Sequence, residues 1–282
     1  MVSKSSNSGS SEEANPSEMK EIPVISLDQK DAAQALVRAF ETIGFATLID
    51  HGVDPSSMQA AFHASSQFFS LPTSTKMESK YQSHSSNRGY IPFQAESHDH
   101  HQNPDHKETF DIGWDGGDDD ESKEKIAEVN ENGSSEFTTP WPKEEVAPNM
   151  KEHLVAYFQA CNTLNLRVMR LLGEGMELDD VDFFVKRCNE KHCNLRLLHY
   201  PELIEPQYLK EPVLVRGQKH TDFGTVSLLA QDSVGGLRVQ KRGETQWFPV
   251  PPVANSFVVN VGDMLQRWTN DRLLATPHQV VH

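Results

Sequence analysis

The sequence predicts an α+β protein whose C-terminal half is a double-stranded β-helix, a jelly-roll core of the cupin type. From Asn194 onward, short apolar stretches alternate with Gly and Pro, which is typical of a β-sandwich or barrel. Between residues 146 and 172, apolar residues recur with a 3.6-residue period and predict one long helix. Shorter helical patterns precede it, so we expect a helical N-terminal region packed on the barrel.

The elements of the N-terminal half follow from local patterns. The apolar run at 22–26 predicts a strand, and the spacing over 32–43 predicts a helix that ends at Gly44. A second strand is expected over 45–52. The Asp-Pro pair at 54–55 is a helix start, and the inner face of that helix should consist of Met58, Ala61, Phe62, Ser65, Phe68 and Phe69.

Composition divides the chain into three parts. Residues 1–20 are rich in Ser, Asn and Glu and predict a disordered leader. Residues 21–142 form an N-terminal region in which periodicity fades from about Lys76, so we expect a long loop with an acidic insert near 115–136. Residues 143–282 contain the long helix and the jelly-roll core. A His-rich tract, made of His98, His100, His101 and His106, is either a second metal site or substrate entrance, or a set of exposed loop histidines.

Charge and hydropathy exclude several classes of partner. The formal net charge is −15, so a polyanion is repelled and nucleic acid is not an expected ligand. No stretch approaches 18 apolar residues, so we expect no membrane span. Three cysteines are too few for a disulfide framework and favour a reducing compartment, the cytoplasm. Nothing in the sequence demands more than a monomer.

Two imidazoles and a carboxylate are the candidate metal ligands. His220 and Asp222 are two residues apart, and on a strand residues i and i+2 point to the same face. His278 is the candidate for a third ligand. This donor set leaves three positions of an octahedral Fe(II) open for a cosubstrate and O₂, whereas zinc prefers four tetrahedral ligands. An H-x-D pair alone is a weak signal, and its context decides the interpretation.

Several motifs occur in order along the chain: GFATLIDHGV, RGYIPF, KETFDIG, LRLLHYP, HTDFGTVSLLAQD, GGLRVQ and NSFVVNVGDMLQRW. Through them the sequence resembles, over nearly all of residues 22–282, the soluble 2-oxoglutarate-dependent Fe(II) dioxygenases that include isopenicillin N synthase. The resemblance implies oxidative decarboxylation of 2-oxoglutarate coupled to hydroxylation or desaturation of a small organic substrate. Fe(II), 2-oxoglutarate and O₂ would be the cofactor and cosubstrates.

The resemblance also assigns roles to residues. It implies that the iron ligands are His220, Asp222 and His278. Tyr200 matches the tyrosine that binds the far carboxylate of 2-oxoglutarate, although Leu198 stands where the family often has Asn. The NVGD motif at 260–263 matches a structural turn. The predicted substrate contacts are Tyr90 and Phe223.

One departure from the family keeps alternatives open. The family carries an Arg-x-Ser about ten residues beyond the distal His, and its Arg pairs with the cosubstrate carboxylate. The given sequence ends at His282 and lacks this motif. A truncated sequence is one explanation. The others are an iron oxidase of the isopenicillin N synthase type that does not use 2-oxoglutarate, and a non-catalytic homologue.

Overall fold

The structure is a computed structural model, and it describes residues 21–81, 87–96, 104–114, 138–188, 193–203, 208 and 213–282. The predicted leader, the predicted acidic insert, and His98, His100 and His101 lie outside the described residues. None of the helices in the described part combines the length and the apolar character needed to cross a bilayer.

The described strands form three sheets. The first has the order β1 (Val24–Ser26), β2 (Phe45–Ile49), β10 (Phe257–Val261) and β7 (Val226–Leu229), with only β1 and β2 parallel. The second is antiparallel, in the order β6 (Val215–His220), β11 (His278–Val281), β8 (Leu237–Gln240) and β9 (Trp247–Pro249). The third consists of β3 (Gly89–Ile91), β4 (Glu108–Gly113) and β5 (Asn194–His199).

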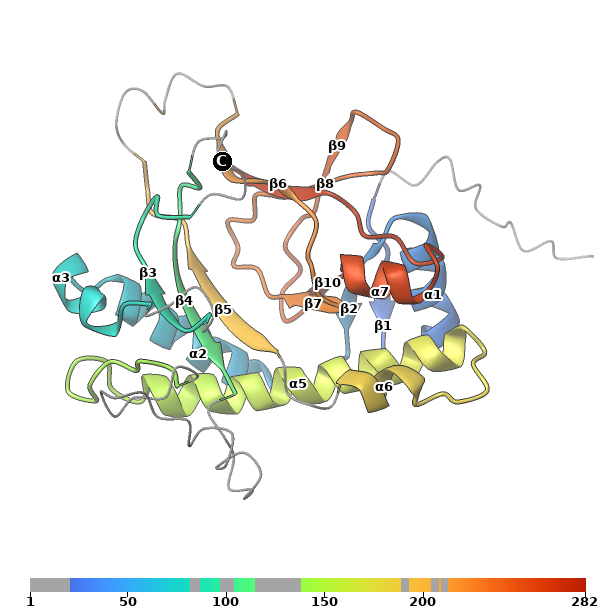
Figure 1. Cartoon of the computed structure of the whole chain (residues 1–282), viewed down its shortest axis with the longest axis horizontal. Coiled ribbons are helices and arrows are strands. Elements are labelled where there is room, and N and C mark those ends of the chain that lie inside the picture. The colour runs from blue at the N-terminus through green and yellow to red at the C-terminus, as the bar shows by residue number, and fades with distance from the viewer. Residues whose placement is uncertain are drawn as a thin grey trace, which may run out of the picture.

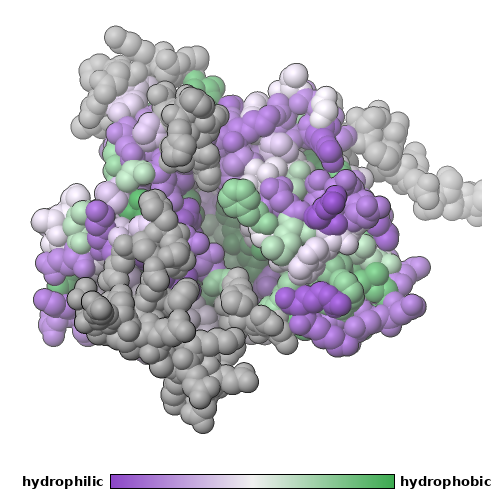
Figure 2. Space-filling view, viewed as in Figure 1, coloured by the Kyte–Doolittle hydropathy of each residue, from purple (hydrophilic) through white to green (hydrophobic). Residues whose placement is uncertain are grey.

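The C-terminal strands alternate between two sheets. Along the chain, β6 lies in the second sheet, β7 in the first, β8 and β9 in the second, β10 in the first and β11 in the second. Figure 1 shows β6 and β8 in one layer and β2, β7 and β10 in another, and Figure 2 shows an apolar recess near the middle of the same face. This alternation is the jelly-roll arrangement, so the predicted fold class is confirmed. The N-terminal strands β1 and β2 extend the first sheet, which a purely helical N-terminal region would not do.

Local signals in the sequence set the ends of two helices. The helices are α1 (Ala32–Thr42), α2 (Pro55–Phe69), α3 (Thr73–Lys76), η1 (Met77–Ser79), α5 (Met150–Gly175), α6 (Phe183–Cys188) and α7 (Asp263–Trp268). The Asp54 carboxylate accepts a hydrogen bond from the Ser56 backbone N–H at 2.8 Å and caps α2, with Pro55 at its first position. Gly44 follows α1 with φ +73°, and a Cβ there would lie 2.0 Å from the Leu274 carbonyl oxygen, so this position requires glycine.

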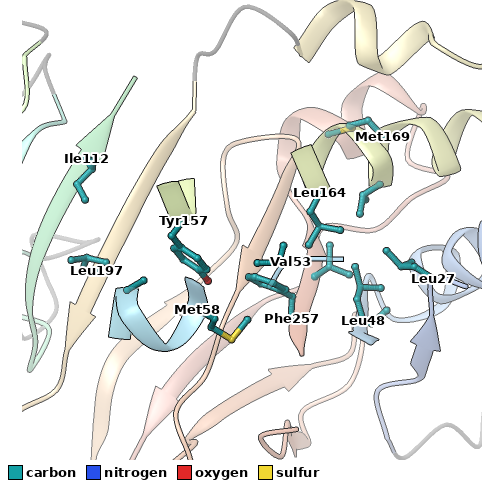
Figure 3. Packing of buried hydrophobic residues seen from close by; sticks show 14 of the residues in the cluster. Leu27, Leu48, Val53, Met58, Ile112, Tyr157, Leu164, Met169, Leu197 and Phe257 are labelled. Carbon is teal, nitrogen blue, oxygen red and sulfur yellow. The ribbon is translucent and has the colours of Figure 1, made fainter. Parts of the chain in front are cut away.

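The helices and the first sheet share one hydrophobic core. Figure 1 shows α5 running along the side of the molecule opposite β6 and β8. In Figure 3, Tyr157 and Leu164 of α5 cluster with Phe257 of β10 and Leu48 of β2. Leu48 and Phe257 are at most 1% exposed. Burying a side chain of this size stabilises the fold by about 1.5–3 kcal/mol, so this core fixes the position of β10.

The region from Lys76 to Pro142 was predicted as a loop, and this prediction is partly wrong. Its described residues include β3 and β4. Every residue of β4 is buried, and the strand lies between β3 and β5. A strand covered on both faces shows no polar–apolar alternation, which explains why the sequence pattern did not reveal it.

Other boundaries also differ from the prediction. The long helix α5 begins at Met150, four residues after Val146, because Asn149 before it has a left-handed backbone with φ 57°. On α2, Phe62 is 39% exposed, and Ala64 is buried in the inner face instead. The residues after NVG form helix α7, which was not predicted.

Candidate metal centre

The structure brings the three predicted metal ligands together. One ligand atom from each of His220, Asp222 and His278 lies within 4.8 Å of the other two. The Nε2 atom of each histidine is 3.6 Å from Asp222 Oδ1. The two imidazole ring centroids are 4.3 Å apart. Because of this spacing a single ion between the three atoms can contact all of them, as the two-His-one-carboxylate donor set requires.

The ligands come from two paired strands and the bend that follows one of them. His278, the first residue of β11, pairs in register with His220, the last residue of β6. Asp222 lies two residues beyond the end of β6. The prediction that His220 and Asp222 share one face of a continuous strand is therefore wrong, because Asp222 lies outside the strand. Other contacts must hold Asp222 in position.

Neighbouring strands hold the Asp222 carboxylate. Its Oδ2 accepts hydrogen bonds from Ser227 Oγ of β7 at 2.5 Å and from Asn260 Nδ2 of β10 at 2.8 Å. Burial alone would raise the pKa of Asp222, but the nearby His278 and these two hydrogen bonds lower it below its usual value. The carboxylate is therefore charged, with Oδ1 turned toward the imidazoles.

Backbone carbonyls fix the tautomer of both histidines. His220 Nδ1 lies 2.7 Å from the Gln218 carbonyl oxygen, and His278 Nδ1 lies 3.2 Å from that of Thr276. A carbonyl oxygen only accepts, so each Nδ1 carries the proton. In the neutral form of each ring, Nε2 is then the nitrogen whose lone pair can bind a metal ion.

A glycine allows the bend that carries Asp222 to approach β10. A Cβ at Gly262 would lie 2.2 Å from the Gly224 carbonyl oxygen and 2.9 Å from that of Asp222. The Asp222 carbonyl also accepts from the Asp263 N–H at 2.7 Å. The NVGD motif is predicted to be structural, and its residues contact the bend that carries Asp222.

The contact of Ser227 with Asp222 was not identified from the sequence, because one serine in a short strand carries no distinct sequence signal.

One side of the cluster is accessible. The side chains of His220 and Asp222 are 27% and 25% exposed, and that of His278 is 8% exposed. The next residue, Phe223, is 84% exposed. A second molecule can therefore approach the three ligand atoms from the side on which Asp222 and His220 meet solvent.

Tyr200 lies beside the strands that carry the histidines. It follows β5, and a Cβ at Gly217 would lie 3.3 Å from its hydroxyl oxygen and 3.5 Å from Val280 Cβ. Gly217 of β6 pairs with Val280 of β11, two residues beyond His278. Burial, with a smaller contribution from Asp105, raises the pKa of Tyr200, so its hydroxyl keeps its proton and remains a donor.

Two other predicted residues lie elsewhere. Tyr90 is 1% exposed, packs on Phe68 with ring centroids 5.9 Å apart, and donates a hydrogen bond to Glu108. A side chain this buried offers no surface to a substrate, so the predicted substrate contact of Tyr90 is corrected to a core position. His106, the one described histidine of the His-rich tract, packs against Phe93 and is not part of the three-residue cluster.

A jelly roll that brings two imidazoles and one carboxylate together is typical of mononuclear non-haem iron oxygenases. Two family models match the chain: the N-terminal model of the non-haem dioxygenases in morphine synthesis over residues 22–142, and the 2OG-Fe(II) oxygenase superfamily over residues 191–282. The chain is 33% identical over 271 residues to the 2-oxoglutarate-dependent dioxygenase ecdK of Aspergillus rugulosus, covering 90% of this chain and 76% of that protein. It is 32% identical over 269 residues to citB of Monascus ruber, covering 92% and 78%.

A solved structure gives the same result. A full-length protein of Neurospora crassa, crystallised in complex with α-ketoglutarate, is similar with a TM-score of 0.78 and 31% identity, covering 94% of this chain and 80% of that one. The chain therefore belongs to the 2-oxoglutarate- and Fe(II)-dependent oxygenase superfamily. It is an oxidoreductase that uses Fe(II), 2-oxoglutarate and O₂. These findings favour the dioxygenase over the two alternatives, the oxidase and the non-catalytic homologue.

Proposed function

We propose that His220 Nε2, His278 Nε2 and Asp222 Oδ1 bind the Fe(II) of this dioxygenase, and that the Tyr200 hydroxyl donates to the distal carboxylate of 2-oxoglutarate. The convergence of the three ligand atoms within 4.8 Å of one another carries the proposal. Each histidine turns Nδ1 to a backbone carbonyl and so offers Nε2 to the metal, and Asp222 is charged, which matches the ligands that ferrous iron takes from proteins.

When bound, the iron with 2-oxoglutarate and O₂ supplies the oxidising power that breaks a substrate C–H bond, while 2-oxoglutarate is converted to succinate and CO₂. The protein's own residues orient these reactants. The carbonyls of Gln218 and Thr276 hold the two imidazoles. Ser227 and Asn260 keep Asp222 Oδ2 occupied, so that only Oδ1 is offered to the metal.

The substrate is proposed to be a small organic molecule that is hydroxylated or desaturated next to Phe223. Phe223 is 84% exposed and follows the proposed metal ligand Asp222 directly, and a bound substrate would cover its apolar ring. Structures of the same Neurospora crassa protein hold thymine or 5-formyluracil together with α-ketoglutarate, which supports a ligand of this size.

We also propose that the protein acts as a cytoplasmic monomer. Cys161, Cys188 and Cys193 are free thiols, as expected in a reducing compartment. The net charge of −15 disfavours self-association and nucleic-acid binding. Light scattering on the purified chain measures the oligomeric state, and a dimer mass would contradict the monomer.

The test of the metal site is iron retention by the full chain. The protein is loaded anaerobically with Fe(II), desalted, and assayed for bound iron and for succinate formed from 2-oxoglutarate. Asp222→Ala and His278→Ala should lose both iron and succinate formation. The exposed His63→Ala and Asp179→Ala serve as matched controls and should retain them. Full iron content in Asp222→Ala would refute the ligand assignment.

A further inference from the structure

Arg216 is a buried arginine beside the proposed cosubstrate residue. It lies on β6, four positions before His220, and is 4% exposed. Its Nη2 donates hydrogen bonds to the carbonyl oxygens of Pro201 at 2.6 Å and His106 at 3.2 Å. Its guanidinium carbon lies 5.7 Å from the centroid of the Tyr200 ring, within the range of a cation–π contact.

The charge of Arg216 has no carboxylate counterpart among the described residues. None of the ion pairs found there includes Arg216, and its Nε has no hydrogen-bond partner. Buried arginines are ordinarily paired with an acid, because an isolated charge is costly to remove from water. Among the described residues, the guanidinium therefore places an unbalanced positive charge beside Tyr200.

Neighbouring residues fix the segment of β6 that carries Arg216. The His106 N–H donates to the Arg216 carbonyl oxygen at 2.8 Å, and Asp105 Oδ1 accepts from the Gln218 N–H at 2.9 Å. Asp105 in turn pairs with Lys107 at 2.5 Å. These contacts lie along the outer edge of β6, an edge strand of its sheet among the described strands, and hold the backbone that carries Arg216.

We propose that Arg216 is a positioning residue for the cosubstrate. Its guanidinium holds the Tyr200 ring and the Pro201 carbonyl, so that the tyrosine hydroxyl stays beside Gly217 of β6. Its positive charge beside the ring also makes the Tyr200 hydroxyl a stronger donor to a carboxylate of a dianion such as 2-oxoglutarate, so this effect too depends on the hydroxyl. The proposal rests on the proposed role of Tyr200.

The experiment measures 2-oxoglutarate binding directly, by calorimetry on the anaerobic Fe(II)-loaded full chain. Tyr200→Phe should raise the Kd about tenfold, the change that corresponds to one lost hydrogen bond to a charged group. Arg216→Gln should raise it by a similar factor while iron content stays unchanged. The exposed Arg38→Gln is the matched control and should keep the wild-type Kd.

The double variant Tyr200→Phe/Arg216→Gln separates positioning from a structural role. If Arg216 acts through Tyr200, the double variant binds 2-oxoglutarate about as weakly as either single variant. If the double variant instead raised the Kd by the product of the two single-variant factors, the proposal would be overturned. A wild-type Kd in Arg216→Gln, together with reduced thermal stability, would overturn it as well. An unchanged Kd in Tyr200→Phe would instead overturn the role of Tyr200.

If Arg216→Gln does not fold, the variant Arg216→Lys replaces it. Arg216→Lys keeps the charge without the planar guanidinium and should raise the Kd several-fold. A wild-type Kd in that variant would contradict the proposal.

Discussion

The buried carboxylate of Glu108 provides a stringent test of how the N-terminal region is held together. Its oxygens accept hydrogen bonds from Lys76 Nζ at 2.9 and 2.7 Å, from the Tyr90 hydroxyl, and from His199 Nδ1 at 2.8 Å. The Lys76 and Glu108 side chains are 6% and 7% exposed. The change Glu108→Gln leaves the Lys76 ammonium buried without its counter-charge. Breaking a buried pair in this way costs about 3–5 kcal/mol.

The pH dependence gives a second measure of the same interaction. The hydrogen bonds from His199, Lys76 and Tyr90 outweigh the effect of burial and lower the pKa of Glu108 from 4.5 to about 2. Because the pKa of Glu108 is lower in the folded than in the unfolded protein, its ionised carboxylate stabilises the fold at every pH above the unfolded-state pKa. This stabilisation is lost as the pH falls from about 4.5 toward 2. The shift corresponds to about 3 kcal/mol, in agreement with the cost of breaking the pair.

Urea denaturation at several pH values measures both effects. At pH 7 the free energy of unfolding of Glu108→Gln should be about 3–5 kcal/mol lower than that of the wild type, and the difference should narrow below about pH 4.5. The double variant Lys76→Met/Glu108→Gln removes the unpaired ammonium and should recover part of the loss. A single variant within about 1 kcal/mol of the wild type at pH 7 would refute the reasoning.

The remaining predictions concern single contacts. Asp54→Ala removes the cap of α2 and should lower the free energy of unfolding by about 1 kcal/mol in urea denaturation, whereas an unchanged value would show that the cap contributes nothing. Ser227→Ala removes a hydrogen bond to Asp222 Oδ2 and should weaken Fe(II) binding roughly 10- to 100-fold in a competition titration with a chelator; wild-type affinity would contradict this support. Gly262→Ala forces the bend at Gly224 to move, because its Cβ would lie 2.2 Å from that carbonyl oxygen. It should reduce iron retention while the circular dichroism spectrum stays that of a folded protein, and full iron content would show that the bend adapts without moving Asp222.

The sequence predicted the jelly roll and the three candidate ligands because both leave local patterns. Short strands between Gly and Pro mark the barrel, and the His-x-Asp pair with a distal histidine is a recognisable donor set. The bend that holds Asp222 was not predictable from strand geometry, since the strand ends at His220. Ser227 and Asn260 reach Asp222 from β7 and β10, and such contacts between separate strands leave no periodic signal.

Tyr90 illustrates why single aromatic residues are ambiguous. Its motif matched the family, but a tyrosine in a short strand can face either a pocket or the core. The hydrogen bond that directs the Tyr90 side chain into the core is made with Glu108, 18 positions further along the chain. Arg216 is a similar case, because its importance depends on the ring of Tyr200 and the carbonyl of Pro201, which reach it through tertiary contacts.

The location of the iron tests the account most directly. A crystal of the anaerobic, Fe(II)-loaded full chain would reveal the ion by its anomalous scattering. We predict a single strong peak at bonding distance from His220 Nε2, His278 Nε2 and Asp222 Oδ1, with its opposite side free of protein ligands. A peak at other side chains, or a loaded protein whose iron lies away from these three atoms, would contradict the proposed centre.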